Sequence, residues 1–280
     1  MPAQSGAVTG KLGIVAGRGS LPGKLLEACR ARGRPVFVVA LEGEADGAVI
    51  GDVPHARVRI GAAGKLIRLL HQQRCEDVVL AGPIARPSLS TLRPDRRGVR
   101  ILGRLVAARG GDDSLLTVVI EELEGEGFRV IGADEVLAEL LAPAGRWGVH
   151  QPDAAAFSDI ERGVAVIQGL GALDIGQAVI VQQGRILGVE AAEGTDILIA
   201  RCADLRLDEG PAGVLVKMSK PGQQRRADMP TIGLRTVVGA ANTGLAGIAV
   251  EADGALAHDR DEAVALADRL GLFLYGLTAT

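Results

Sequence analysis

The chain has 280 residues, of which 48% are hydrophobic and 2% aromatic, and its formal net charge is -3. This many apolar residues can bury a substantial core, which excludes a disordered chain, and the scarcity of aromatic rings disfavours a stacking surface for single-stranded nucleic acid. The slightly negative charge provides no positive field either, so we predict no nucleic-acid partner.

The first half alternates short apolar strands with helices. A strand at residues 11–16 leads through a glycine turn into a helix at 21–32, and the continuous apolar run at 35–41 is typical of a strand buried on both faces. This alternation predicts βαβ units and a Rossmann-like parallel sheet. The further elements expected here are a helix at 64–74, a strand at 77–81 and a helix at 112–125.

Glycine and proline gather at residues 141–153 together with the single tryptophan, and we place the domain boundary there, giving domains 1–145 and 146–280. In the second half, Gln183-Gly184 between two apolar runs indicates a hairpin, so we expect an α/β domain with a mixed sheet. Its expected helices are 154–170, 194–203, 234–242 and 261–270, and its expected strands are 178–182, 185–189, 213–217, 247–250 and 272–275.

The three cysteines lie far apart in the sequence, which fits neither a disulfide framework nor a zinc cluster and favours a reducing, cytoplasmic compartment. No segment of about 20 residues is free of charge, so we expect no membrane-spanning helix. Attachment to a membrane surface stays open.

The turn after the first strand is the first candidate site. It lacks the third glycine of the dinucleotide fingerprint, and Leu25 stands where a Walker loop needs Ser or Thr. A glycine turn at a helix N-terminus nevertheless presents backbone N–H groups that suit a phosphate or a nucleotide, and the alternative is a plain tight turn. The predicted contacts are Gly17, Gly19, Ser20 and Leu21.

A second turn follows the strand at 77–81. Ligands of open parallel sheets bind beyond the carboxyl ends of the strands, so Gly82 and Arg86 would face the same crevice as the first turn, unless Arg86 is simply an exposed loop residue. An arginine-rich stretch follows, which could meet anionic lipid headgroups or a diphosphate, or form a solvated face. Its members are Arg93, Arg96, Arg97, Arg100 and Arg104.

Two polar segments in the second half are candidates for phosphate chemistry. Glu190, Glu193 and Asp196 lie within seven residues, where carboxylates could bind a hard cation such as Mg²⁺ or cap a helix. The stretch at 217–230 surrounds Asp228 with cations that could neutralise a diphosphate, while Asp228 holds the metal or orients water. The alternative is a surface ion-pair loop. The cations are Lys217, Lys220, Arg225 and Arg226.

Seven segments together resemble the LpxI-type UDP-2,3-diacylglucosamine pyrophosphatases of lipid A biosynthesis, and they follow that family's order over nearly the whole chain. They are LGIVAGRGSLP (12–22), LAGPIARP (80–87), GDDSLL (111–116), DIGQAVIV (174–181), VEAAEGTD (189–196), KPGQQRRADMPTIG (220–233) and GLAGIAVEA (244–252). The resemblance implies two α/β domains with a substrate cleft between them. It also implies Mg²⁺-dependent hydrolysis of the substrate to UMP and 2,3-diacylglucosamine 1-phosphate (lipid X).

The resemblance also implies roles for single residues. Asp228 matches the catalytic, metal-associated aspartate of an R-x-D-x-P element. From the residues themselves we expect Asp228 to share the metal with Glu190, Glu193 or Asp196. The further expected substrate contacts are Asp113, Thr195, Lys217, Lys220, Gln223 and Arg226.

The chain departs from the family pattern at two places. Gln224 stands where relatives often have an acid, and Arg18 stands where many have a small residue. We expect a cytoplasmic enzyme that is peripheral on the inner membrane, with domain closure near residues 142–152 and a possible homodimer. Two alternatives remain: a nucleotide-sugar or dinucleotide-dependent oxidoreductase, and a non-catalytic nucleotide-lipid binding protein.

Overall fold

The computed structural model describes residues 10–84, 92–108, 112–171, 173–207, 209–226 and 228–278, with only the backbone at 106–108 and 112–114. The chain folds into two compact units, Met1–Ala138 and Glu139–Thr280. The division lies a few residues before the boundary that we place at 145/146 in the sequence. Each unit has its own sheet and its own core.

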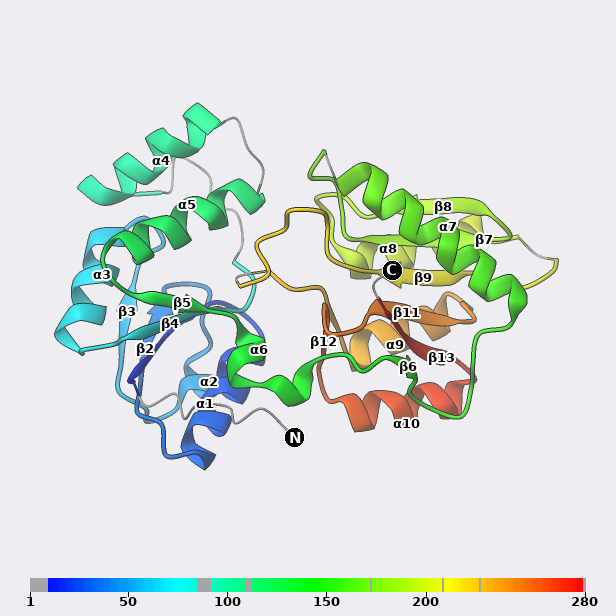
Figure 1. The fold of residues 1–280 in the computed structure, drawn as a ribbon, viewed down its shortest axis with the longest axis horizontal. Helices are drawn as coiled ribbons and strands as arrows, with labels where there is room; N and C mark the ends of the chain where they lie inside the picture. Colours follow the sequence, from blue (N-terminus) through cyan, green and yellow to red (C-terminus); the bar gives the residue numbers. More distant parts are fainter. Residues whose placement is uncertain are drawn as a thin grey trace. The chain divides into compact units, whose positions relative to one another are not determined.

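The N-terminal unit is built on a five-stranded parallel sheet with the strand order β3-β2-β1-β4-β5 (Figure 1). β1 and the following β2 consist of apolar residues that are almost all buried, because helices cover both faces of the sheet. This confirms the predicted Rossmann-like parallel sheet. The strands are β1 (Leu12–Ala16), β2 (Val36–Leu41), β3 (His55–Val58), β4 (Asp77–Ala81) and β5 (Arg129–Ile131).

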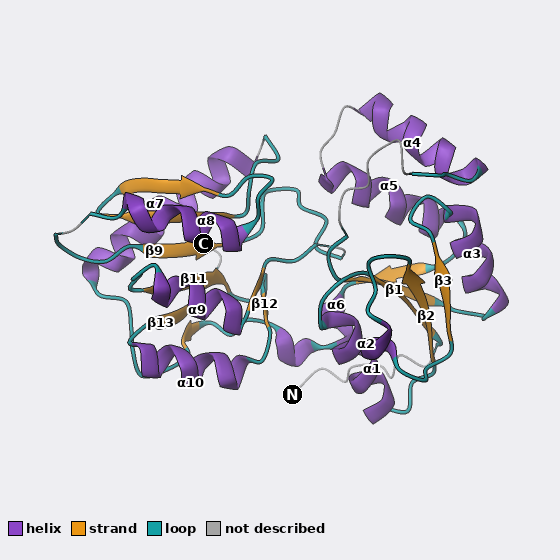
Figure 2. Ribbon diagram, turned by 180° about the vertical axis from the view of Figure 1, so that it is seen from behind, coloured by secondary structure: helices purple, strands orange, loops and turns teal. Residues whose placement is uncertain are grey.

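Helices cover the sheet of the N-terminal unit in two groups, α1 with α2 and α6 on one face and α3 with α4 and α5 on the other (Figures 1 and 2). The chain moves outward from β1 to β3 and then returns to place β4 on the other side of β1. The helices are α1 (Leu21–Ala31), α2 (Gly47–Ile50), α3 (Ala63–Gln72), α4 (Arg96–Ala108), α5 (Asp112–Gly125) and α6 (Ala133–Val136).

The C-terminal unit is built on a six-stranded mixed sheet with the order β6-β13-β11-β9-β7-β8. β9, β11 and β13 are parallel, whereas β6, β7 and β8 each run antiparallel to a neighbour. This confirms the predicted mixed sheet. The strands are β6 (Gly145–Arg146), β7 (Ala178–Gln182), β8 (Arg185–Val189), β9 (Val214–Lys217), β11 (Gly247–Glu251) and β13 (Phe273–Leu277), and a separate parallel pair is formed by β10 (Thr231–Ile232) and β12 (Leu256–Ala257).

Alternate side chains of β7 serve two different cores. Val179 and Val181 pack under α7, whereas Ala178 and Ile180 point into the core beneath α8, α9 and α10. The sheet is therefore covered on both faces, which explains why its central strands are mostly aliphatic, with the polar residues Gln182, Lys217 and Glu251 at strand ends. The helices are α7 (Ala154–Gly171), α8 (Thr195–Cys202), α9 (Leu234–Asn242) and α10 (Arg260–Leu270), with short 3-10 helices at Ala138–Leu140 and Ala203–Leu205.

The predicted hairpin lies between β7 and β8. Gln183 and Gly184 both have positive φ angles, 53° and 74°, as a tight two-residue hairpin turn requires. Asp159 of α7 reaches this turn and accepts hydrogen bonds from both backbone N–H groups, at 2.9 Å and 2.6 Å. A buried carboxylate thus serves backbone donors that the sheet leaves unpaired.

The three cysteines are buried free thiols, as expected from their spacing. Burial raises the pKa of Cys75 to about 11 against the opposing effect of Lys11, so this thiol stays protonated. Among the helices in the described part of the chain, none combines the length and the apolar character that crossing a membrane requires.

Candidate functional site

The first candidate site lies at the carboxyl ends of β1 and β4, where two glycine turns meet. The backbone N–H of Gly17 donates to Ala81 O at 2.8 Å, and that of Arg18 donates to Pro83 O at 2.9 Å. Since the chain leaves β1 toward one side of the sheet and β4 lies on the other side, this is the topological switch point. In open α/β sheets, ligands bind at this position.

Glycine is required at two positions because the turns pack backbone against backbone. A Cβ on Gly82 would lie 2.1 Å from Arg18 O, and the φ angle of Gly82 is +89°. A Cβ on Gly17 would lie 2.6 Å from Gly82 O. The two glycines therefore shape the site and do not merely make the chain flexible.

Beyond Gly17, the first turn leads into the N-terminus of α1. Gly19 has a φ of +84°, and an added Cβ there would meet nothing within 4 Å. Ser20 is the N-cap residue, yet its side chain makes no capping hydrogen bond, and Leu21 begins the helix. Gly19, Ser20 and Leu21 thus form an open helix N-terminus, whose N–H groups and dipole favour an anion.

Arg18, the residue that departs from the family pattern, connects the glycine turn to the loop after β2. Its Nε lies 2.7 Å from Glu44 Oε2, and the Glu44 side chain is nearly buried while Arg18 is half exposed. The ion pair with Glu44 therefore neutralises the positive charge that Arg18 would otherwise add to the turn. The predicted contact Arg86 lies outside the described residues, and Asp113 lies in the first turn of α5, where the structure gives no side chain.

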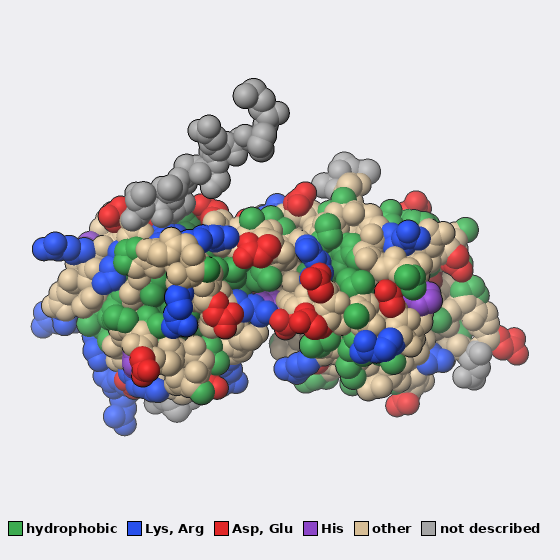
Figure 3. Space-filling view, turned by 90° about the horizontal axis from the view of Figure 1, so that it is seen from below, with side chains coloured by type: hydrophobic (Ala, Val, Ile, Leu, Met, Phe, Trp, Pro, Cys, Tyr) green, Lys and Arg blue, Asp and Glu red, His purple; other side chains and the backbone are tan. Residues whose placement is uncertain are grey.

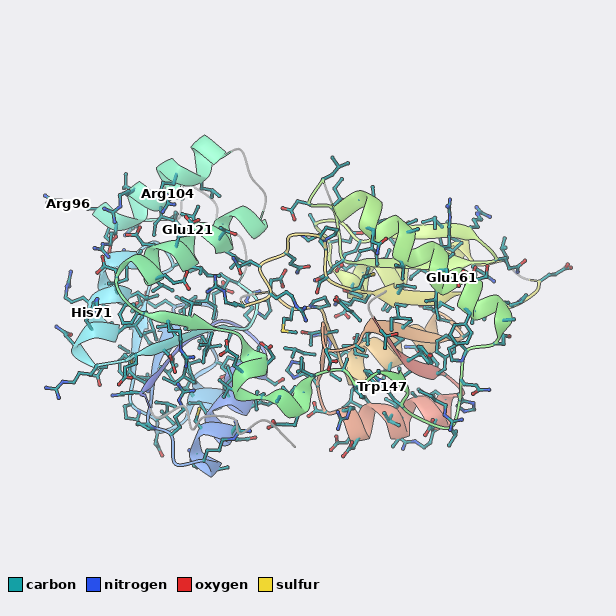
Figure 4. All side chains as sticks on the ribbon, viewed as in Figure 1. His71, Arg96, Arg104, Glu121, Trp147 and Glu161 are labelled. Carbon is teal, nitrogen blue, oxygen red and sulfur yellow. The ribbon has the colours of Figure 1, made fainter. Side chains whose placement is uncertain are left out.

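The arginine-rich stretch lies in the helix α4, except for Arg93 before it, and α4 packs beside α5. Arg104 lies 2.5 Å from Glu121, as the two neighbouring helices in Figure 4 illustrate, and Arg97 and Arg100 both contact Glu122 of α5. These charges pair the two helices with each other. On the face drawn in Figure 3, basic and acidic side chains are similarly interspersed.

The second candidate site lies at one edge of the C-terminal sheet, at the carboxyl ends of β8 and β9. Because β7 is antiparallel to β9, its amino end lies at the same edge, where Met218 N donates to Gln177 O at 3.0 Å and Glu190 N donates to Ala178 O at 2.8 Å. Polar residues from three neighbouring strands therefore meet there, although they are up to 40 positions apart in the sequence.

Buried Glu190, half-buried Thr195 and buried Lys217 form a hydrogen-bonded chain at this edge. Lys217 Nζ donates to Thr195 Oγ1 at 2.9 Å, and Thr195 Oγ1 donates to Glu190 Oε1 at 2.7 Å. Lys217 also donates to Thr231 O at 2.9 Å. Burial lowers the pKa of Lys217, although the carboxylates of Glu190, Asp228 and Asp196 favour its charged form. Lys217, predicted as a diphosphate contact, is bonded to protein atoms in the interior.

Asp228 lies half-buried beside this chain, in the loop that leads to β10. Its Oδ2 accepts a hydrogen bond from Gln223 Nε2 at 2.7 Å, and its backbone O accepts another at 3.1 Å. The structure thus brings Asp228, Gln223 and Lys217 into one region, as the motif predicts. Gln223 contacts the expected catalytic carboxylate directly.

The remaining predicted cations are bonded within the unit. Lys220 forms an ion pair with Asp174, which precedes β7 in the chain. Arg226 Nε donates to Gln224 Oε1 at 3.3 Å, and Arg225 donates to Asp253 O. Lys220 and Arg226 lie on the same loop as Asp228.

The four predicted metal ligands do not form one cage. Glu193 is paired with Arg201, Asp196 is paired with Arg235, and both oxygens of Glu190 accept hydrogen bonds from within the unit. Over the described ranges, no three Asp, Glu, His or Cys side chains are grouped as metal ligands would be. The fourth predicted ligand, Asp228, also accepts a hydrogen bond at its Oδ2, from Gln223. Mg²⁺ often uses one or two carboxylates together with phosphates.

Two residues of this site were not predicted from the sequence. Gln177 accepts a hydrogen bond from Gln223 Nε2 at 3.3 Å and donates its backbone N–H to Glu190 Oε2 at 3.1 Å. Thr231 accepts from Lys217 through its carbonyl and donates its hydroxyl to Met229 O at 3.0 Å. The only signal for them in the sequence is that they lie next to strand ends, within two of the segments that carry the family resemblance, 174–181 and 220–233.

Comparison with known proteins adds to this geometry. The family models of the LpxI N-terminal domain and the LpxI C-terminal domain match residues 11–140 and 143–275. The chain is 45% identical to the UDP-2,3-diacylglucosamine pyrophosphatase LpxI of Caulobacter vibrioides over 273 residues, which are 95% of this chain and 97% of that protein.

A solved structure was also matched, that of an N5-carboxyaminoimidazole synthase from Aspergillus clavatus in complex with ADP and 5-aminoimidazole ribonucleotide. It is 14% identical, with a TM-score of 0.23, and the match covers 71% of this chain and 44% of that one. At this TM-score the likeness adds nothing to the assignment.

Proposed function

The chain belongs to the LpxI family, and from this premise we propose that it hydrolyses the diphosphate of UDP-2,3-diacylglucosamine to UMP and 2,3-diacylglucosamine 1-phosphate. It is then a hydrolase acting on a phosphoanhydride in lipid A synthesis. The observation that carries the proposal is the 45% identity to a UDP-2,3-diacylglucosamine pyrophosphatase across both units. An identity confined to one unit would support a shared domain only.

The geometry of the C-terminal unit supports this chemistry. A diphosphate repels an attacking oxygen nucleophile, so an enzyme that hydrolyses it has to place positive charge beside the phosphorus and orient the water. Asp228 has a carboxylate anchored by Gln223, and Lys220 and Arg226 share its loop. We assign the orientation of the attacking water to Asp228 and charge neutralisation to the two cations.

Magnesium fits this proposal through one protein ligand. Asp228 would hold it together with diphosphate oxygens, as its match to the aspartate of the family's R-x-D-x-P element implies. Glu193, Asp196 and Glu190 are bonded to other residues of the unit. When bound, Mg²⁺ supplies charge that stabilises the developing negative charge on the phosphate oxygens. Asp228 would then both hold the ion and orient the water. Lys217 and Glu190 support this region through hydrogen bonds to Thr231 and Thr195.

The N-terminal unit is assigned the uridine end of the substrate. Its glycine turn at the switch point presents an open helix N-terminus at Ser20 and Leu21, which suits a nucleotide phosphate. The two acyl chains make the substrate a membrane lipid, since each buried CH₂ contributes about 0.8 kcal/mol to partition. We therefore place the protein on the cytoplasmic surface of the inner membrane.

The proposal is tested by product analysis with the purified full-length chain. UDP-2,3-diacylglucosamine in mixed micelles should yield UMP and the lipid monophosphate in equal amounts with Mg²⁺, and neither product with a chelator. Release of UDP instead would mean cleavage of the sugar–phosphate bond and would overturn the assignment, as would no turnover. Equal rates with and without chelator would remove the metal from the proposal.

A further inference from the structure

Hydrogen bonds, together with the short backbone segment from Asp228 to Thr231, form a closed circuit that includes Asp228. The circuit runs from Gln177 to Glu190, through Thr195 to Lys217 and on to the carbonyl of Thr231, whose hydroxyl bonds the carbonyl next to Asp228. Gln223 closes it by bonding both Asp228 and Gln177. The circuit joins β7, β8, β9 and the start of β10, so the position of Asp228 is tied to the sheet.

Gln223 is the member that contacts the Asp228 carboxylate in this circuit. Its side chain is only 8% exposed. A tight turn at residues 220–223 directs it inward, since Gln223 N donates to Lys220 O at 3.0 Å and Gly222 has a φ of +80°. A side chain facing into the protein in this way has little surface left for a bound substrate.

The orientation of the Gln223 amide follows from its surroundings. Its Oε1 faces the backbone N–H of Lys220 at 2.8 Å, which can only donate. Its Nε2 faces three oxygens, those of Gln177 at 3.3 Å and the carboxylate and carbonyl of Asp228 at 2.7 Å and 3.1 Å. A reversed amide would place oxygen against oxygen and nitrogen against N–H, so only one orientation satisfies both sides.

We propose that Gln223 is a positioning residue that fixes the Asp228 carboxylate for hydrolysis, and not the substrate contact that the sequence motif suggested. Holding Oδ2 stops rotation about the terminal torsion of Asp228 and thereby sets the direction of the other carboxylate oxygen. Catalytic groups displaced by about 1 Å can lose about 100-fold in rate. The proposal rests on the proposed function for its kinetic consequence and on the contacts alone for its structural one.

The kinetic test compares Gln223→Met with Gln182→Met. Gln182 is a matched control, because it is buried in the same unit, at the far end of β7, with Oε1 accepting Leu207 N and Nε2 donating to two backbone carbonyls. Gln223→Met should lower kcat about 100-fold and leave KM within about threefold of the parent value. Gln182→Met should change neither by more than about threefold.

Two kinetic outcomes would overturn the proposal. A rise in KM at unchanged kcat would make Gln223 a substrate contact, and an equal fall of kcat in both variants would reduce its role to general stability. Gln223→Glu serves as a second variant, since it keeps the shape and replaces the donor by a carboxylate oxygen facing Asp228. It should lower kcat at least as much as Gln223→Met, and a parent-like kcat would count against the proposal.

A second measurement does not depend on turnover. In protein labelled with ¹⁵N-glutamine, the side-chain NH₂ signals of Gln223 should shift on Asp228→Asn, whereas those of Gln182 should stay in place. Unmoved Gln223 signals would overturn the positioning role. If the parent cleaves no nucleotide-lipid, the proposed function fails, and this NMR measurement still decides whether Gln223 binds Asp228.

Discussion

The candidate site of the N-terminal unit consists of backbone groups, whereas that of the C-terminal unit consists of side chains. In the N-terminal unit, two glycine turns form the site by packing backbone against backbone, and an added Cβ on Gly82 would collide with Arg18 O at 2.1 Å. In the C-terminal unit, side chains from three strands form it through hydrogen bonds, centred on Lys217 and Gln223. A backbone site recognises an anion by N–H groups and shape, whereas a side-chain site can supply charge and orient water.

This difference indicates which part of the proposed reaction each unit serves. The strand ends of the N-terminal unit present a helix N-terminus beside an ion-paired Arg18, which suits binding. The C-terminal unit concentrates buried charge at one edge of its sheet, which suits chemistry. Substitutions in the two sites should therefore fail in different ways.

The largest expected effect on stability is that of Gly82→Ala, which tests the backbone site. The new Cβ would overlap Arg18 O and take a φ of +89°, so the N-terminal unit should lose about 3 kcal/mol or more of its free energy of unfolding. Affinity for UMP should fall with it. Hydrogen exchange of β1 and β4, together with calorimetric titration with UMP, would measure both effects.

Gly103→Ala is the control for that experiment. Gly103 lies in α4 with nothing within 4 Å of an added Cβ, so alanine should be neutral or should stabilise the helix by up to about 1 kcal/mol. If both variants behaved alike, the close packing of the two turns would not be what requires glycine at Gly82.

A smaller loss is expected from Lys217→Met, which tests the side-chain site. The change removes the cation beside Glu190 and leaves Thr231 O without that donor, at a cost of about 2–3 kcal/mol in the C-terminal unit. Urea unfolding can be followed by the fluorescence of Trp147, because it is the only tryptophan and lies in this unit.

Lys65→Met provides the comparison, since Lys65 is exposed and bonds only a backbone carbonyl among the contacts that the structure gives its ammonium group. It should change stability by less than about 0.5 kcal/mol. Parent-like unfolding of Lys217→Met would show that the buried lysine does not hold this edge together.

The smallest effect is expected from Asp95→Asn. This substitution tests whether the Asp95 carboxylate stabilises the N-terminal unit by accepting hydrogen bonds from backbone N–H groups. Burial would raise the pKa of Asp95, but hydrogen bonds from the N–H groups of Gly98, Lys65, Gly64 and Arg97 outweigh burial and lower it from its ordinary 3.8. These bonds cap the starts of α3 and α4.

The sign of the pH dependence follows from that lowered pKa. The stabilisation is present above pH 3.8 and is lost as the pH falls through the lower value of the folded state. Asp95→Asn should therefore cost about 1 kcal/mol at pH 7 and converge with the parent below that range. Denaturation at a series of pH values would show it, and a constant difference down to pH 2 would contradict the capping role.

Continuous apolar runs made the central strands predictable. Residues of β1, β2 and β4 are mostly buried, and apart from Asp77 at the start of β4 the sequence there is apolar. β3 was missed because this edge strand, HARV, is largely exposed, and β5 was missed because it has three residues. The helix α4 was missed because its arginines were interpreted as a charged stretch, whereas their spacing places them against glutamates of α5.

The sequence segments that form the sites could be predicted, but the contacts between their side chains could not. Glu190, Glu193 and Asp196 lie close in sequence, yet one lies at a strand end, one in a turn and one in the first turn of a helix, so their carboxylates point to different partners. The bond between Gln223 and Gln177 depends on the antiparallel pairing of β7 with β9, which no local pattern reveals.

The most direct test of the central claim is the rate of UMP release by Asp228→Ala in the presence of Mg²⁺. The exposed Asp204 offers a control, because Asp204→Ala changes an acid of the same unit away from this site. We predict that Asp228→Ala loses roughly 1,000-fold or more in kcat while the substrate still binds, and that Asp204→Ala keeps the parent rate. Parent-like turnover by Asp228→Ala would contradict the account.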